Sequence, residues 1–249
     1  MPKRPLKLPE VLAQKKDISF VICLDEFQNL ATFPNYEGLE KNMRAIWQRQ
    51  KRVSYCLYGS KRHMMTEIFN NSSKPFYRFG DIILLQKISE GDWVDFIYEG
   101  FAKTGKSISP EMARKMPQIM KNHSWYVQQL AHYTWQKTKH GAGMEQLSEA
   151  LDELIGANSP LYQKDVEILS VTRLNLLKAI GKGERQLTSV RVMDEFKLGT
   201  PRNVCLNLNN LINADIVHKT GDGMEFLDPA FELWFKSIYF KEDYSNQLY

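Results

Sequence analysis

An apolar run that ends in two carboxylates is the feature that most constrains this chain. Ile18 to Leu24 are nearly all β-branched, aromatic or otherwise apolar, and Asp25 and Glu26 follow directly. A short run of this kind between polar residues is typical of a buried parallel strand. Two charges at the end of a buried strand cost free energy unless they have partners at the sheet edge.

Two further apolar runs predict more of the same sheet. Val53 to Tyr58 reads as a second buried strand, and a helix-compatible stretch from Gly38 to Gln50 separates it from the first. Strand, helix and strand in this order predict a right-handed crossover between parallel strands. Ile82 to Leu85 predicts a third strand. The first part of the chain is therefore expected to be an open α/β sheet.

Beyond Ser89 the pattern is helical. Four helices are expected at residues 91–103, 110–121, 124–139 and 144–155, followed by a linker at Gly156–Pro160. Helices near residues 165–180, 189–197 and 201–212 and a hairpin over 217–227 then outline a winged-helix domain. We expect three regions: residues 1–87 as the C-terminal part of an α/β domain, 88–158 as a helical lid, and 159–249 as the winged helix.

Composition narrows the class of protein without naming a partner. The chain has 249 residues with 33 Lys and Arg against 29 Asp and Glu, a net charge of only +4. A bias this small does not by itself indicate binding to nucleic acid or to an anionic membrane. No apolar stretch approaches the length of a membrane span, and the dispersed cysteines fit a reducing compartment. We expect a cytoplasmic protein in which Cys23 and Cys56 pack as small hydrophobes.

Asp25 and Glu26 fit the second acidic motif of P-loop ATPases. In that motif an apolar strand ends in an Asp that orients Mg²⁺, commonly through water, and a Glu that polarises the attacking water. Ligands of open α/β sheets also bind at the carboxyl edge of the strands. The alternative is a strand that simply ends in a solvated acidic turn.

Val21 to Leu30 resembles the signature of the archaeal-type ATPase family, in the STAND group of AAA+-related P-loop proteins. Four other segments are similar to later parts of that family, in the same order: Tyr55–Ser60, Lys74–Arg78, Val127–Ala131 with Trp135, and Leu227–Phe231 with Trp234. The resemblance covers nearly the whole chain. It implies a partial AAA+-like parallel sheet, a helical lid and a C-terminal winged helix.

The resemblance also implies roles for individual residues. Asp25 would assist Mg²⁺, Glu26 would be the catalytic base, and Ser60 would sense the γ-phosphate of ATP. Arg78 would be an arginine finger offered to a neighbouring subunit, so a homo-oligomer or another protein partner is implied. Arg78 as a surface arginine with a local partner, and Ser60 as part of a common Gly-Ser turn, remain open. The family's Gly-x-Pro-like turn is replaced here by Asn122–Tyr126, which leaves any nucleotide contact of that turn in doubt.

A literal phosphate-loop pattern occurs at Gly100–Ser107, in the wrong context. A working loop follows a buried strand and opens directly into a helix, so that its N–H groups converge on phosphate. Here the pattern follows a helical face and precedes a helix start at Ser109 and Pro110. We interpret it as a helix C-terminus capped near Gly105, favoured by Lys103 and Lys106. Only a circular permutation of the fold would allow this pattern to act as a phosphate loop.

A genuine phosphate loop is expected about 80 or more residues before Asp25, on the first strand of the sheet. Only 17 residues precede Ile18, and none forms a Gly-Lys-Ser/Thr turn. We therefore expect a truncated chain that lacks the Walker A segment and binds ATP poorly when alone.

The winged helix suggests a rival function, because its second short helix can enter a DNA major groove. Possible nucleic-acid contacts on and beside residues 201–212 are Arg202, Asn203, Asn207 and Lys219. Lys197 and His218 lie nearby. This face carries few positive charges, whereas contacts to phosphate dominate DNA affinity. A protein-interaction or packing role is therefore the alternative. The histidines and cysteines show no zinc-ligand spacing, and no other hydrolase signature is present.

Overall fold

The computed structural model describes residues 4–221 and 223–244, with only the backbone described at 62 and 63. The chain divides into two compact units, Met1–Leu85 and Gln86–Tyr249. The first contains α1 (Arg4–Lys16), β1 (Phe20–Leu24), a 3-10 helix η1 (Phe27–Thr32), α2 (Tyr36–Trp47), β2 (Val53–Leu57) and α3 (Arg62–Asn70). Within the described residues, no helix is both long and apolar enough to cross a bilayer.

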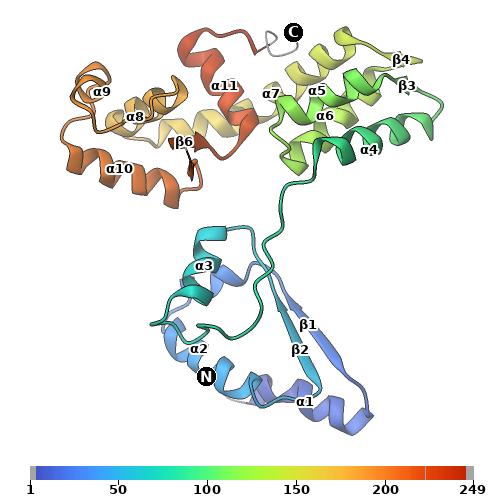
Figure 1. The fold of residues 1–249 in the computed structure, drawn as a ribbon, viewed down its shortest axis with the longest axis vertical. Helices are drawn as coiled ribbons and strands as arrows, with labels where there is room; N and C mark the ends of the chain where they lie inside the picture. The colour runs from blue at the N-terminus through green and yellow to red at the C-terminus, as the bar shows by residue number, and fades with distance from the viewer. Residues whose placement is uncertain (1–3, 222, 245–249) are drawn as a thin grey trace. The chain divides into compact units, whose positions relative to one another are not determined.

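The first unit is built on the predicted parallel strand pair. β1 and β2 lie side by side with Phe20 opposite Val53 and Leu24 opposite Leu57, joined through α2 (Figure 1). One face of the pair packs on the helices, where the rings of Trp47 and Tyr55 stack with centroids 4.0 Å apart. Both predicted strands and the crossover helix are confirmed.

The opposite face of the strand pair is open, which differs from the two-sided burial expected from the sequence. The exposed side chains alternate along the strands, as the pleat requires: Val21, which is 71% exposed, and Cys23 on β1, with Cys56 on β2. Cys23 and Cys56 are directly opposite in register. The expectation that both cysteines pack as small hydrophobes is wrong, because within the described residues no helix covers this face.

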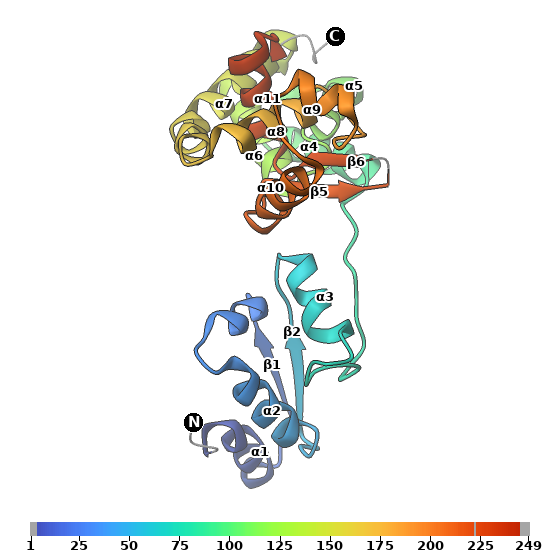
Figure 2. The same ribbon diagram turned by 90° about the vertical axis from the view of Figure 1, so that its left-hand side faces the viewer.

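The predicted third strand at Ile82–Leu85 does not form. These four side chains are 50%, 82%, 50% and 92% exposed. Figures 1 and 2 draw the segment as a coil and not as a strand. A strand is stable only when its backbone groups pair with a neighbour. Among the described residues, β1 and β2 pair only with each other, and residues 82–85 pair with neither strand.

The second unit begins with helices packed around one apolar core. Its first elements are α4 (Glu90–Ala102), β3 (Ser107–Ile108), α5 (Pro110–Ile119), α6 (Ser124–Lys137), β4 (Gly141–Ala142) and α7 (Met144–Glu167). Ser89 and Ser109 cap α4 and α5 by accepting hydrogen bonds from backbone N–H groups three residues on. The four helices predicted for this part of the chain are therefore present.

The linker expected at Gly156–Pro160 is part of α7, which runs unbroken for 24 residues. Its buried face continues on both sides of that stretch, from Leu147 and Leu154 to Tyr162 and Val166. Tertiary packing of such a face outweighs the local cost of Gly and Pro in a helix. Ser159 also accepts a hydrogen bond from the indole of Trp234, at 2.9 Å. The helical region and the C-terminal region consequently share one core.

The C-terminal region has the element order of a winged helix. It contains α8 (Val171–Gly181), α9 (Val190–Glu195), α10 (Pro201–Asn213), the antiparallel hairpin of β5 (Val217–Thr220) and β6 (Gly223–Phe226), and α11 (Pro229–Phe240). Ser170, Ser189, Thr200 and Asp228 cap α8, α9, α10 and α11 through their side-chain oxygens. The polar caps explain why α9 and α10 begin within a residue of their predicted starts. α8 begins six residues later than predicted, because residues 165–167 belong to α7 and Ser170 caps the new helix.

Candidate functional site

The carboxyl ends of β1 and β2 bring three predicted site residues together. Asp25 and Glu26 follow β1, and Ser60 lies three residues beyond the end of β2. Two backbone hydrogen bonds extend the pairing past the strands: Tyr58 N–H to the Leu24 carbonyl at 3.1 Å and Phe27 N–H to the Tyr58 carbonyl at 3.0 Å. The two turns are thereby held against each other at one edge of the sheet.

Glu26 is held by two side-chain donors. Its Oε2 accepts a hydrogen bond from Nε2 of Gln28 at 2.6 Å, and its Oε1 accepts a longer one from Oγ of Ser60 at 3.4 Å. The residue is exposed and has a left-handed backbone, with φ 51°, which few non-glycine residues adopt. A fixed, solvent-facing carboxylate at a strand edge can accept a proton from a bound water.

Gln28 is the functional candidate that sequence reasoning missed. Its side chain is fully buried, and its Oε1 has no hydrogen-bond partner. That oxygen faces Gly59, where an added Cβ would lie 1.8 Å from it. Gly59 therefore leaves the room that lets the amide reach Glu26. The only signal in the sequence was an amide two residues after the acidic pair, beside the apolar Phe27.

Asp25 is exposed, and its Oδ1 accepts the backbone N–H of Glu26 at 2.7 Å. Its negative charge is the main cause that raises the pKa of the Tyr58 phenol. No group of three or more His, Cys, Asp or Glu side chains suited to a metal occurs in the described part of the chain. A single carboxylate can hold Mg²⁺ only where substrate phosphates and water supply the other ligands of the ion, as they do in nucleotide-binding sites.

Arg78 makes contacts away from this edge. Its backbone, with φ 50°, donates an N–H hydrogen bond to the Phe69 carbonyl at 3.2 Å, and its guanidinium lies over the Tyr77 ring at 5.2 Å from the centroid. The side chain is exposed, and no acidic partner is found for it among the described residues. The structure therefore does not bring Arg78 to Asp25, Glu26 and Ser60.

The Gly100–Ser107 pattern forms a helix end, as interpreted from the sequence. The N–H groups of Gly105, Lys106 and Ser107 bond to the carbonyls of Ala102, Phe101 and His140, at 3.0, 3.1 and 2.8 Å. The ammonium of Lys106 donates to the Trp135 carbonyl at 2.6 Å and lies 3.9 Å from the centroid of that indole ring. Neither these N–H groups nor the lysine is free to hold a phosphate.

The four predicted nucleic-acid residues differ in how available they are. Arg202 and Asn203 are exposed on α10, and Lys219 is exposed on β5. Asn207 is half-buried, and its Oδ1 accepts a hydrogen bond from Nε of Arg173 at 3.3 Å. Asn207 is thus engaged with α8, while the other three side chains remain on the surface.

The turn at Asn122–Tyr126 joins the helical region to the winged helix. The phenol of Tyr126 donates to the carboxylate of Asp228, at the start of α11, and its oxygen lies 3.0 Å from the hydroxyl of Tyr162 on α7. Nearby, Lys121 pairs with Glu232 at 2.6 Å. This turn has a structural role in the second unit.

Comparisons with known proteins agree with this architecture. A family model described as a probable winged helix domain matches residues 160–237. Among solved structures, the Walker-type ATPase PabY2304 of Pyrococcus abyssi is similar, with a TM-score of 0.73 and 14% sequence identity, over 95% of this chain and 68% of that one. A search of curated proteins found no match. The chain is therefore similar in fold to a Walker-type ATPase, and its residues 160–237 are similar to a winged helix domain.

Proposed function

We propose that this chain is part of an ATPase of the STAND or AAA+ type. It would supply the sheet edge with the catalytic carboxylates, the helical lid and the winged helix. The observation that carries the proposal is Glu26, whose carboxylate is held between Gln28 and Ser60 at the carboxyl edge of parallel strands. Its role is to polarise the attacking water, while Asp25 binds Mg²⁺ through water. ATP and Mg²⁺ are the implied ligands. Residues 1–87 would supply the catalytic edge, 88–158 the lid and 159–249 the winged helix, with α7 running from the second region into the third.

The proposed reaction needs parts that the described residues do not supply. They contain no strand followed by a Gly-Lys-Ser/Thr loop and a helix, so another segment or subunit has to grip the phosphates. The exposed Arg78 guanidinium is suited to a neighbouring subunit's phosphate, because a planar, permanently charged donor stabilises charge that builds up during transfer. Nucleotide binding would then change the state of assembly or the contact with a protein partner.

The test is Mg²⁺-dependent ATP turnover by the chain and by the product of the whole gene region, including any coding sequence before Met1. Replacing a general base usually lowers the rate by about 100-fold or more, so Glu26→Gln should lower turnover by at least that factor. Glu37→Gln, which removes an exposed carboxylate from α2, is the matched control and should leave turnover unchanged. Equal turnover in the wild type and Glu26→Gln rules out the assignment.

Duplex DNA binding is the second candidate function. It is favoured by the winged helix domain, by the exposed Arg202 and Asn203, and by the lack of any acidic residue on α10. Contacts to phosphate make such binding salt-sensitive. Gel-shift assays at low salt should show a complex that weakens in Arg202→Ala and Lys219→Ala. A complex that neither substitution affects, or no complex, excludes this function.

A further inference from the structure

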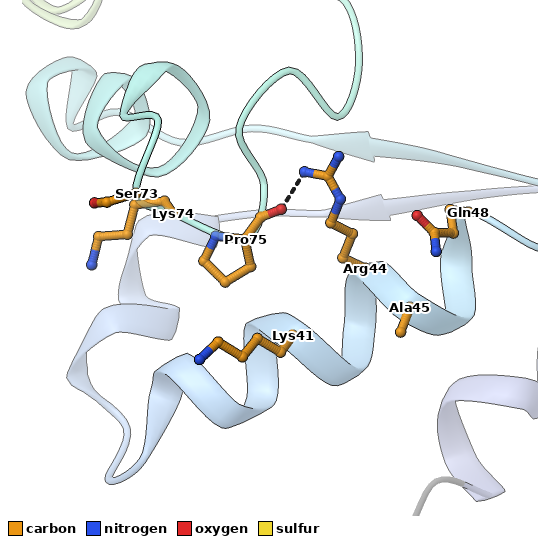
Figure 3. Close-up of a pocket in the computed structure, with 7 residues that line it drawn as sticks. All are labelled: Lys41, Arg44, Ala45, Gln48, Ser73, Lys74 and Pro75. Carbon is orange, nitrogen blue, oxygen red and sulfur yellow. Dashed lines mark hydrogen bonds between the residues drawn. The ribbon is translucent and has the colours of Figure 1, made fainter.

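The net positive charge of the chain comes from the first unit. Over residues 1–85 there are 14 Lys and Arg against 8 Asp and Glu, whereas the remaining residues are slightly acidic. Part of this charge gathers in a pocket of about 290 Å³ between α2 and the loop that follows α3 (Figure 3). Its polar lining consists of Lys41, Arg44, Gln48, Ser73 and Lys74. None of these residues belongs to the edge formed by Asp25, Glu26 and Ser60.

The pocket holds three cations and no carboxylate. Arg44 is fixed because its Nη1 donates to the carbonyls of Pro75 and Tyr77, the latter at 2.8 Å, which leaves Nε and Nη2 available. Lys74 donates to the Tyr36 hydroxyl at 2.7 Å, and that hydrogen bond raises the pKa of the lysine, so it stays charged. Lys41 is exposed and has no partner in the described part of the chain. The ammonium ends of Lys41 and Lys74 point to the same end of the pocket (Figure 3).

Two neighbouring carboxyl groups, Glu37 and Glu40, act on Lys74 from outside the pocket lining. Glu40 is fully buried beside the pocket, and neither of its oxygens has a hydrogen-bond partner. Burial raises the pKa of Glu40 against the opposing effect of Lys74. Neither Glu37 nor Glu40 lines the pocket, and its lining contains no carboxylate. The positive charge of the pocket is therefore left for a ligand from outside.

We propose that the pocket between α2 and residues 73–75 binds a phosphate group, separately from the Asp25–Glu26 edge. A phosphate monoester carries about 1.5 to 2 negative charges near neutral pH, and its oxygens can accept from the two ammonium groups at the shared end of the pocket, while the Arg44 guanidinium adds positive charge at the other end (Figure 3). A single carboxylate has one charge and fewer acceptor positions for three cations. The group is inorganic phosphate or the monoester phosphate of a nucleotide.

The experiment is an NMR titration of the full chain with sodium phosphate, against sodium chloride at equal ionic strength. The amides of Ser73 and Lys74 and the side-chain amide of Gln48 should shift saturably with phosphate and not with chloride. Lys41→Gln should weaken binding about tenfold or more, because it removes one charged donor. Lys16→Gln removes an exposed lysine of α1 in the same unit and should leave affinity unchanged.

Three results would overturn the proposal: no saturable shift at these amides, equal weakening by the two lysine variants, or equally tight binding of acetate. A parallel titration with AMP distinguishes the source of the phosphate. Tighter binding of AMP than of inorganic phosphate would identify a nucleotide monoester as the ligand, and the reverse order would identify the free ion.

Discussion

The side-chain amide of Gln28 donates a hydrogen bond to the carboxylate of Glu26, with 2.6 Å between Nε2 and Oε2. A fully buried side chain thereby positions an exposed one. The donor restricts the rotation of the Glu26 carboxylate, which suits a base that has to face a water molecule. Two substitutions separate this positioning role from simple packing.

Gln28→Leu should lower ATP turnover about tenfold while changing the free energy of unfolding by less than about 1 kcal/mol. Leucine fills a similar volume and removes the unpartnered Oε1, so the packing cost is small. Glu26 loses its buried donor, however, and becomes mobile. Turnover assays and urea unfolding followed by circular dichroism measure the two effects. If Gln28→Leu unfolds the first unit, or leaves turnover unchanged, the positioning role is wrong.

Gly59→Ala should destabilise the first unit by roughly 1–3 kcal/mol, the usual cost of inserting a methyl group into packed space. The added Cβ would lie 1.8 Å from Oε1 of Gln28. Gly80→Ala is the control, because nothing lies within 4 Å of a Cβ at that position. In a Gln28→Ala background the cost of Gly59→Ala should largely disappear. An undiminished cost in the double mutant would show that the clash is not its cause.

The resemblance to a known family implied that Asp25, Glu26 and Ser60 belong to one site. Sequence patterns predicted β1, β2 and most helices, because these follow from apolar periodicity. They misjudged segments whose conformation depends on distant partners. Ile82–Leu85 has a strand composition but no strand beside it, and Gly156–Pro160 has a loop composition but lies on a helix with a continuous buried face. Local propensity is overruled by packing in both cases.

The role of Gln28 was equally hidden, because it depends on the space left by Gly59, 31 residues further on. The exposure of Cys23 and Cys56 escaped prediction for a related reason. An apolar strand does not reveal whether one or both of its faces are covered.

Lys106→Met should destabilise the second unit by about 1 kcal/mol without affecting nucleotide binding. The lysine lies over the Trp135 ring and donates to the Trp135 carbonyl, so its charge stabilises the helix end. Lys103→Met is the matched control within the same motif, because its ammonium is exposed and, in the described part of the chain, pairs with Glu99 alone. Thermal unfolding and ATP binding are the measurements. A specific loss of ATP binding in Lys106→Met would restore the phosphate-loop interpretation.

Two half-buried histidines should make the second unit less stable below about pH 6.5. Burial lowers the pKa of His123; the charge of Lys87 also lowers it, and the charge of Asp228 raises it. Burial likewise lowers the pKa of His218. The unfolded chain therefore binds more protons than the folded one as the pH falls from 6.5 through the lowered values, and stability falls with it. Urea unfolding between pH 8 and pH 5 measures the slope.

Replacing both histidines by glutamine should reduce that slope, whereas replacing the exposed His132 should not. An identical slope in the double variant would assign the pH dependence to other groups.

Tyr126→Phe should lower the free energy of unfolding of the second unit by roughly 1–3 kcal/mol, because Asp228 would lose a buried donor. Burial raises the pKa of both Tyr126 and Tyr162, so the two phenols stay neutral and keep their hydrogen atoms for donation. Tyr133→Phe removes a hydroxyl from the same helix that has no partner in the described residues, and it should have little effect. Because the three side chains join α6, α7 and α11, Tyr126→Phe should weaken the helical region and the winged helix together, in one unfolding transition. Separate transitions for the two regions, or equal effects of the two tyrosine variants, would contradict a shared core held together at this contact.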